Sequence, residues 1–348
     1  MKKILLFLLL LIPTVVNADV KVLTHLIDAE IEIAGALKVK ETIIIEGDTK
    51  VFSRNLNYKM IDEVWNKQDL NFKSSPIYNG YSLENIKVSA FKTNDEIDFN
   101  HEVKSFFNEL DPTKKSTNFY TKVNNKLGTN ININYDTSKN EKTAYYIEYL
   151  ITNVIVAHND INELNFTFNN LNYNAANTLI RVIIPYPTDS DLFNVWLHGP
   201  SNGELNYLIN ENKEKVGIIS SFPKINSNVN VRLTLPKEQV GIDIYLNKTK
   251  TDALNKIKQV ENSRLDRQNF NNKSLKVIKY VVIILSIIYV ISSPSLYKYY
   301  SKSLSIVYLL LGAIITGFNF IFKFNIIYVY LILFAPLIII LIRKLHKK

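Results

Sequence analysis

The chain has 348 residues, of which 47% are hydrophobic and 21% are charged, a balance typical of a folded protein. It contains no cysteine, which excludes disulfides, thiolate metal sites and cysteine nucleophiles. The formal net charge of +9 would suit a nucleic-acid-binding protein, but the basic excess lies at the two ends of the chain. Residues 19–275 carry 30 basic and 32 acidic side chains, so we predict no nucleic-acid partner.

The first 18 residues have the pattern of a secretory signal peptide. Two lysines follow the initial methionine, and an apolar run over residues 4–16 leads to Val16-Asn17-Ala18. Small or β-branched side chains at these positions favour cleavage after Ala18, and the run is short for a membrane span. We therefore expect the segment after Ala18 to be exported, with an uncleaved anchor as the alternative.

Residues 19–240 show the period-two alternation of apolar and polar side chains that is typical of strands. Many short strands with turns between them predict an extracytoplasmic antiparallel β-sandwich. The first two strands, 25–33 and 37–43, are expected to form a hairpin around Ala34-Gly35. Further strands are expected at residues 83–92, 128–135, 143–157, 161–169, 177–185, 192–198, 204–210, 214–221 and 228–235.

Two of these segments carry sharper predictions. Residues 143–157 are expected to form one central strand whose buried face holds Tyr145, Ile147, Tyr149 and Ile151. Residues 102–110 are expected to form a short helix that ends before Asp111-Pro112.

The carboxyl-terminal part of the sequence changes character twice. Residues 241–275 are rich in charge and predict a polar helical stalk. Residues 276–348 predict a transmembrane bundle with spans at 277–293, 304–322 and 326–342, each close to the length that crosses a bilayer. Export of the preceding region would place the short tail in the cytoplasm, so the lipid bilayer is an expected partner.

The search for catalytic and metal-binding motifs yields no catalytic, cofactor-binding or metal residue. No histidine lies at zinc-site spacing. His158 and His198 are expected in loops with solvent-exposed polar roles. Asp160 and Glu163 could form a carboxylate pair for glycoside cleavage, although carboxylates are common at strand ends. Aromatic side chains that could line a groove, but are better explained by core packing, are Trp196, Tyr186 and Phe193.

The order of several motifs resembles that of domain-of-unknown-function family 2207, predicted membrane proteins with an exported β-rich amino-terminal domain. The similar stretches are Gly35-Ala36-Leu37-Lys38-Val39-Lys40-Glu41, then Phe52-Ser53-Arg54, then Tyr146-Ile147-Glu148-Tyr149, and then Asp160 with Glu163-Leu164-Asn165-Phe166. Ile183-Ile184-Pro185 and Gly199-Pro200-Ser201-Asn202-Gly203 follow in the expected order. Phe166 stands where the family tends to have tryptophan, and the family's long cytoplasmic region and Gly-rich tail are missing. The resemblance implies a membrane location and carries no established activity.

Three functions remain open from the sequence. The first is a non-enzymatic surface protein that binds an envelope component or a partner protein. The second is a cell-wall hydrolase that uses carboxylates of the sandwich, and the third is a subunit of a membrane protein complex. A cleft of convergent carboxylates would favour the hydrolase.

Overall fold

The computed structural model describes residues 20–58, 81–94, 96–111, 116, 118–168, 174–225, 227–242, 244–271, 273–274, 277 and 280. The chain divides into two units, Met1–Lys258 and Gln259–Lys348. The expected signal peptide and the expected spans 304–322 and 326–342 lie outside the described residues, as does nearly all of the span 277–293. Within the described part of the chain, no helix is both long and apolar enough to cross a membrane.

The first unit is built from strands, as the alternation predicts. The strands are β1 (Val20–Ile31), β2 (Leu37–Gly47), β3 (Val51–Leu56), β4 (Ser82–Lys92), β5 (Asn108–Glu109), β6 (Phe119–Asn124), β7 (Thr129–Asn134), β8 (Lys142–Thr152), β9 (Ile155–Ala157), β10 (Asn162–Phe168), β11 (Thr178–Thr188), β12 (Asn194–His198), β13 (Glu204–Ile209), β14 (Lys215–Phe222), β15 (Val229–Leu235) and β16 (Leu246–Lys248). A 3-10 turn, η3 (Lys237–Gln239), follows β15.

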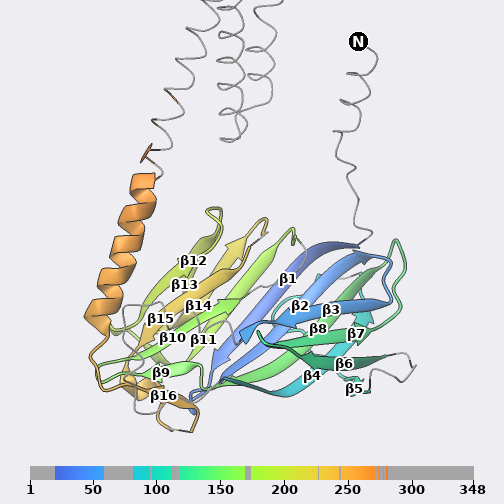
Figure 1. The fold of residues 1–348 in the computed structure, drawn as a ribbon, viewed down its shortest axis with the longest axis horizontal. Helices are drawn as coiled ribbons and strands as arrows, with labels where there is room; N and C mark the ends of the chain where they lie inside the picture. Colours follow the sequence, from blue (N-terminus) through green and yellow to red (C-terminus); the bar gives the residue numbers. More distant parts are fainter. Residues whose placement is uncertain are drawn as a thin grey trace, which may run out of the picture. The chain divides into compact units, whose positions relative to one another are not determined.

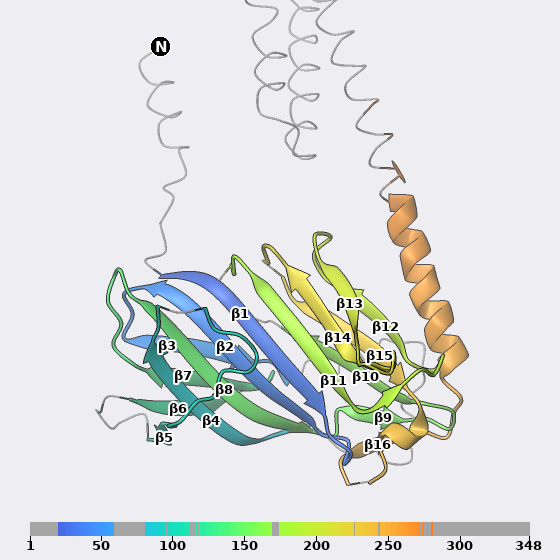
Figure 2. The same ribbon diagram turned by 180° about the vertical axis from the view of Figure 1, so that it is seen from behind.

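Three sheets share one hydrophobic core (Figures 1 and 2). The largest has seven strands in the order β13-β14-β11-β1-β2-β8-β4. A four-stranded sheet, β3-β7-β6-β5, lies over the β2–β8 end, and a five-stranded sheet, β12-β15-β10-β9-β16, lies over the β11–β14 end. The result is two sandwich halves that share their broad sheet.

The antiparallel prediction is wrong at the seam between these halves. Strand β1 pairs with β11 in parallel, with His25 opposite Thr178, and the pairs β9–β16 and β5–β6 are also parallel. The remaining strand pairs are antiparallel, and the halves join through β1 and β11, which run in the same direction. Local alternation cannot show this, because it reports the faces of a strand and not its direction relative to a distant partner.

The predicted hairpin of β1 and β2 is present, with Ile31 opposite Leu37. Gly35 at its turn has φ of +86°, a conformation that favours glycine. A Cβ atom there would also lie 2.9 Å from the carbonyl oxygen of Tyr245. The turn therefore needs glycine both for its backbone conformation and for its packing against the segment before β16.

Strand β8 is central, and the predicted face is the buried one. Tyr145 and Ile147 are 0% exposed, Ile151 is 1% exposed and Tyr149 is 3% exposed. The strand ends earlier than expected, however, because Asn153 takes a left-handed conformation (φ of 61°) that separates β8 from β9.

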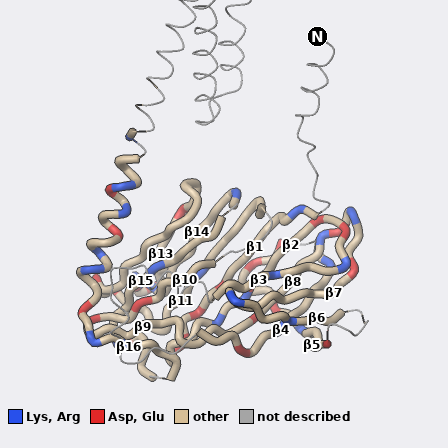
Figure 3. Tube along the Cα trace, viewed as in Figure 1, with Lys and Arg blue, Asp and Glu red and all other residues tan. Residues whose placement is uncertain are grey.

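Two predicted helices have different outcomes. Residues 102–110 are not helical: they run irregularly and end in β5, so that prediction is wrong. Phe107 instead donates its backbone N–H to the carbonyl of Val88, a tertiary contact that replaces a helical hydrogen bond. Residues 254–271 are helical, but the expected helical stalk over 241–275 is wrong for its first part, where Leu246–Lys248 form β16 and pair with β9. Along the described chain, basic and acidic residues are interspersed, in keeping with the near balance of charge (Figure 3).

Candidate functional site

A buried polar cluster, here called the Glu41 cluster, joins the seven-stranded sheet to the sheet above it. The Glu41 carboxylate on β2 accepts hydrogen bonds from Nε and Nη2 of Arg54 on β3, at 2.7 and 3.0 Å. It also accepts from the Tyr149 hydroxyl at 2.6 Å and contacts His25 Nε2 at 3.0 Å. Since an ionised carboxylate only accepts, His25 must carry a proton on Nε2. The bidentate arrangement is the strong form of a charge-assisted pair.

Electrostatics keep Glu41 ionised in spite of its burial. Burial alone would raise the pKa of its carboxyl, but the Arg54 guanidinium and His25 hold that pKa well below its usual range. Burial and the Glu41 charge raise the pKa of the Tyr149 hydroxyl far above its usual value, so this hydroxyl stays a donor. The cluster is thus a carboxylate and a guanidinium that neutralise each other.

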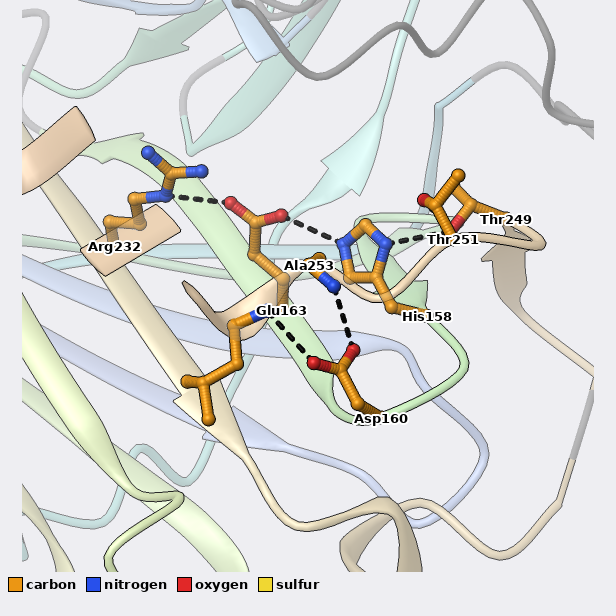
Figure 4. Close-up of polar contacts among 8 residues, drawn as sticks. His158, Asp160, Glu163, Arg232, Thr249, Thr251 and Ala253 are labelled. Carbon is orange, nitrogen blue, oxygen red and sulfur yellow. Dashed lines mark hydrogen bonds and ion pairs between the residues drawn. The ribbon is translucent and has the colours of Figure 1, made fainter. Parts of the chain in front are cut away.

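A second cluster that also contains a glutamate, an arginine and a histidine, the Glu163 cluster, lies in the other half (Figure 4). Glu163 on β10 accepts from Arg232 Nε on β15 at 2.7 Å and contacts His158 Nε2 at 3.0 Å. His158 Nδ1 lies 2.7 Å from the Thr249 hydroxyl. Burial raises the pKa of the Glu163 carboxyl, whereas Arg232 and His158 lower it, with a net lowering. Both clusters place a His, a Glu and an Arg where water is excluded.

Asp160 binds the start of the helix at residue 254 (Figure 4). Its two carboxylate oxygens accept from the backbone N–H groups of Ala253 and Leu254, at 2.8 and 2.9 Å. These are N–H groups that a helix cannot satisfy internally, and a negative charge is favourable at this end. Ile161, Ala253 and Ile257 form a small apolar cluster beside this contact. Asp160 therefore caps the start of the polar helix.

A cavity of about 290 Å³ lies between the two halves. All five consecutive residues 54–58 line it from the first half, together with Tyr149 and Ile151 of β8. Phe166, Thr167 and Phe168 at the end of β10 line it from the second half, with His198, Asn228 and Asn230 beside them. Arg54 and Tyr149 thus connect the cavity wall directly to the Glu41 cluster.

The polar groups of this cavity are mostly amides. Asn55 and Asn57 are half-buried and Asn228 is exposed, and their side-chain amides make no hydrogen bond among the described residues. Asn230 donates to Asn165 Oδ1 and Thr167 Oγ1, which leaves its own Oδ1 as an acceptor. The Arg54 charge is neutralised by Glu41, and no carboxylate lines the described wall of the cavity. A neutral ligand with hydrogen-bond donors and acceptors fits this lining.

The polar residues singled out from the sequence take different positions in the structure. His158 is buried, which contradicts the expected exposed role, because Glu163 and the distant Thr249 enclose its ring. His198 ends β12 and lines the cavity. Asp160 and Glu163 do not converge on a cleft, since each is bound to structural partners.

The three aromatic residues that could line a groove differ in burial. Trp196 packs against the cluster of Ile161 and Ile257, and Phe193 is in the main core, as core packing predicts. Tyr186 is 46% exposed, so core packing is wrong for this residue. Within the described part of the chain, no group of three or more His, Asp or Glu side chains is placed to hold a metal ion.

Sequence reasoning missed Glu41, Arg54 and His25 as a site. One signal was present: the alternation of β2 places Glu41 on the same face as Leu37, Val39 and Ile43, which are all 0% exposed. A carboxylate in such a row must find a buried partner. The identity of that partner depends on how β3 folds over β2, which the local pattern does not give.

Comparison with known proteins supplies a family. The profile of the family described as predicted membrane protein (DUF2207), N-terminal domain, matches residues 24–228, which is more than half of the chain. The chain belongs to this family. Three motif residues of the DUF2207 resemblance, Glu41, Arg54 and Tyr149, meet in the Glu41 cluster, and two more, Asp160 and Glu163, lie near each other in the second half.

Other comparisons add little for this DUF2207 chain. No curated protein matches it. Among solved structures, a candidate protease from Parabacteroides distasonis ATCC 8503 is similar at 10% identity and a TM-score of 0.35, over 63% of this chain. The alignment spans 41% of that protein's length, and at this TM-score it carries no inference about fold or activity.

Proposed function

We propose that the chain is a non-enzymatic binding module of the cell envelope, held at the membrane by its carboxyl-terminal segment. The observation that carries the proposal is the cavity between the two sandwich halves. It is concave, largely apolar, and edged by side-chain amides without partners among the described residues. Pockets of this kind, with a few convergent polar groups, are the usual sites for ligands.

The positions of the carboxylates and the directions of their pKa shifts favour a binding function over glycoside hydrolysis. A glycoside hydrolase needs two carboxyl groups that flank one bond, one of them with a raised pKa so that it can donate a proton. Glu41 and Glu163 are buried with lowered pKa values, and Asp160 holds a helix start. None of the three lines the cavity.

The membrane part of the proposal rests on the family and on the sequence. The family is described as predicted membrane proteins. The secretory pattern of residues 1–18 and the three apolar segments 277–293, 304–322 and 326–342 support an extracytoplasmic domain, a multi-pass anchor and a cytoplasmic tail.

The test uses the full chain in lipid nanodiscs, incubated with soluble peptide and glycan fragments from digested envelopes. Mass spectrometry identifies which fragments the protein retains. The variant Asn228→Trp fills the mouth of the cavity, and Asn206→Trp places the same change on exposed β13, away from the cavity. We expect the wild type and Asn206→Trp to retain the same fragments and Asn228→Trp to lose them. Equal retention by all three, or new cleavage products, would refute the proposal.

A further inference from the structure

We infer that the cavity receives one apolar side chain of an extended peptide whose backbone pairs with the open edge of β3. This inference rests on the proposed binding function and specifies its ligand: an uncharged peptide segment of a partner protein. Three observations support it, namely the position of the cavity along β3, the chemistry of its amides, and its volume.

The cavity follows an edge of β3 and not one of its faces. Successive side chains of a strand point to opposite faces of its sheet. Within β3, Arg54 and Leu56 are buried and Asn55 between them is half-buried, yet all three line the cavity. Only a cavity beside the strand can reach both sets.

That edge has no neighbouring strand in the described part of the chain. β3 is the terminal strand of its four-stranded sheet and pairs with β7 alone, with Arg54 opposite Ile131. A terminal strand presents backbone N–H and C=O groups that an added peptide strand can pair with. At this edge the Asn55 carbonyl already accepts one hydrogen bond, from Arg54 Nη1 at 2.8 Å, and keeps a second lone pair for a peptide N–H. The opposite wall comes from the ends of β10 and β12 and the start of β15, so a peptide would lie between the two halves.

The amides around the cavity match a peptide backbone. Each asparagine side chain offers the same donor and acceptor groups as a peptide unit, and Asn55, Asn57 and Asn228 have these groups free among the described residues. His198, Asn230 and Thr167 lie side by side across β12, β15 and β10 and extend the polar row. No free charge lines the described wall, which disfavours a charged side chain in the cavity.

The volume of the cavity and the stretch of backbone along its side favour a peptide ligand over a sugar. The volume of about 290 Å³ is at the lower end for ligand sites, enough for one large side chain or one sugar ring. The cavity runs past the last three residues of β3, 54–56, and on to Asn57 and Tyr58 just beyond the strand, so its long side follows a stretch of backbone. The aromatic rings of Tyr149, Phe166 and Phe168 enclose the apolar end.

The test measures the affinity of capped seven-residue peptides for the full chain in nanodiscs, by fluorescence anisotropy. The parent peptide alternates threonine and valine around a central leucine, and a second peptide has alanine at the centre. Two further peptides carry N-methyl groups on one or the other alternate set of backbone amides. An oligomer of N-acetylglucosamine is the sugar probe.

We expect the parent peptide to bind and the alanine peptide to bind about tenfold more weakly, because apolar area in the cavity is lost. One N-methylated peptide should lose about tenfold or more, since it lacks the hydrogen bonds to β3, and the other should bind within about threefold of the parent. Asn55→Ala should weaken binding, and Asn206→Ala, an exposed asparagine on β13, should not.

The outcomes separate this inference from the proposed function. Equal loss with both N-methylated peptides, or tighter binding of the sugar than of any peptide, would overturn the inference. A failure of every peptide to bind would overturn it as well. In that case, fragment retention that still depends on Asn228 would leave the proposed function in place with another ligand.

Discussion

The Glu41 cluster allows one stability prediction to be worked out in full. Glu41→Gln keeps the shape of the side chain but removes the charge that faces Arg54, which is 3% exposed. The guanidinium then stays buried beside a neutral amide, and the amide nitrogen, which is only a donor, can accept neither of the two hydrogen bonds that the carboxylate oxygen in its place accepts. Breaking a buried pair from one side costs about 3–5 kcal/mol. This is a large fraction of the about 5–15 kcal/mol that stabilises a typical domain.

The measurement is urea unfolding of the full chain in detergent micelles, followed by tryptophan fluorescence in a Trp65→Phe background, which leaves Trp196, packed against Ile161, as the reporter. The double variant Glu41→Gln with Arg54→Met should recover much of the loss, because it removes both charges. Glu141→Gln, in the exposed pair with Lys92, should leave the unfolding midpoint unchanged. A loss below about 1 kcal/mol for Glu41→Gln would refute the reasoning, since Arg54 would then have found another partner or water.

Further predictions use the same protein. The pKa of Glu41 is lower in the folded than in the unfolded chain, so its contribution to stability is complete above about pH 4.5 and is lost as the pH falls; unfolding free energies from pH 6 to pH 3 should fall more steeply for the wild type than for Glu41→Gln. Ile147→Ala should cost about 2–5 kcal/mol in urea unfolding, because the side chain is 0% exposed; a loss under about 0.5 kcal/mol would contradict the position of β8. Asp160→Ala should cost about 0.5–2 kcal/mol and increase hydrogen exchange over residues 253–257, and unchanged exchange would disprove its role at the helix start. In intact cells, an impermeant maleimide should label Asn206→Cys and spare Lys348→Cys, whereas labelling at residue 348 would rule out three spans.

Much of the fold was accessible from the sequence, because many of its strands alternate over part of their length and are separated by turn residues. The β1–β2 hairpin, the buried face of β8 and the β-rich region between residues 19 and 240 follow from period two and from turn residues. The parallel seam did not follow from the sequence, since β1 and β11 are far apart in the chain and a strand's own pattern does not encode its partner.

The candidate site was less accessible, for the same physical reason. His158 is followed by Asn159 and Asp160, a sequence typical of an exposed loop, yet Thr249 and Glu163 bury it. The cavity needs the edge of β3 and the ends of β10 and β12 to meet, and none of these segments carries a local sign of the others. The resemblance to the family did identify Glu41, Arg54 and Glu163, but as separate motifs.

The parallel seam has a consequence for how the chain is made. β1 can complete its hairpin with β2 early, and β8 and β4 then close the first half, all before residue 153. The other edge of β1 has to wait for β11, whose Thr178 pairs with His25. During synthesis from the amino terminus, the finished first half therefore presents an unpaired edge strand, which can pair wrongly with another nascent chain. The edge stays open until β11 arrives, so a chain truncated before residue 178 should aggregate through β1.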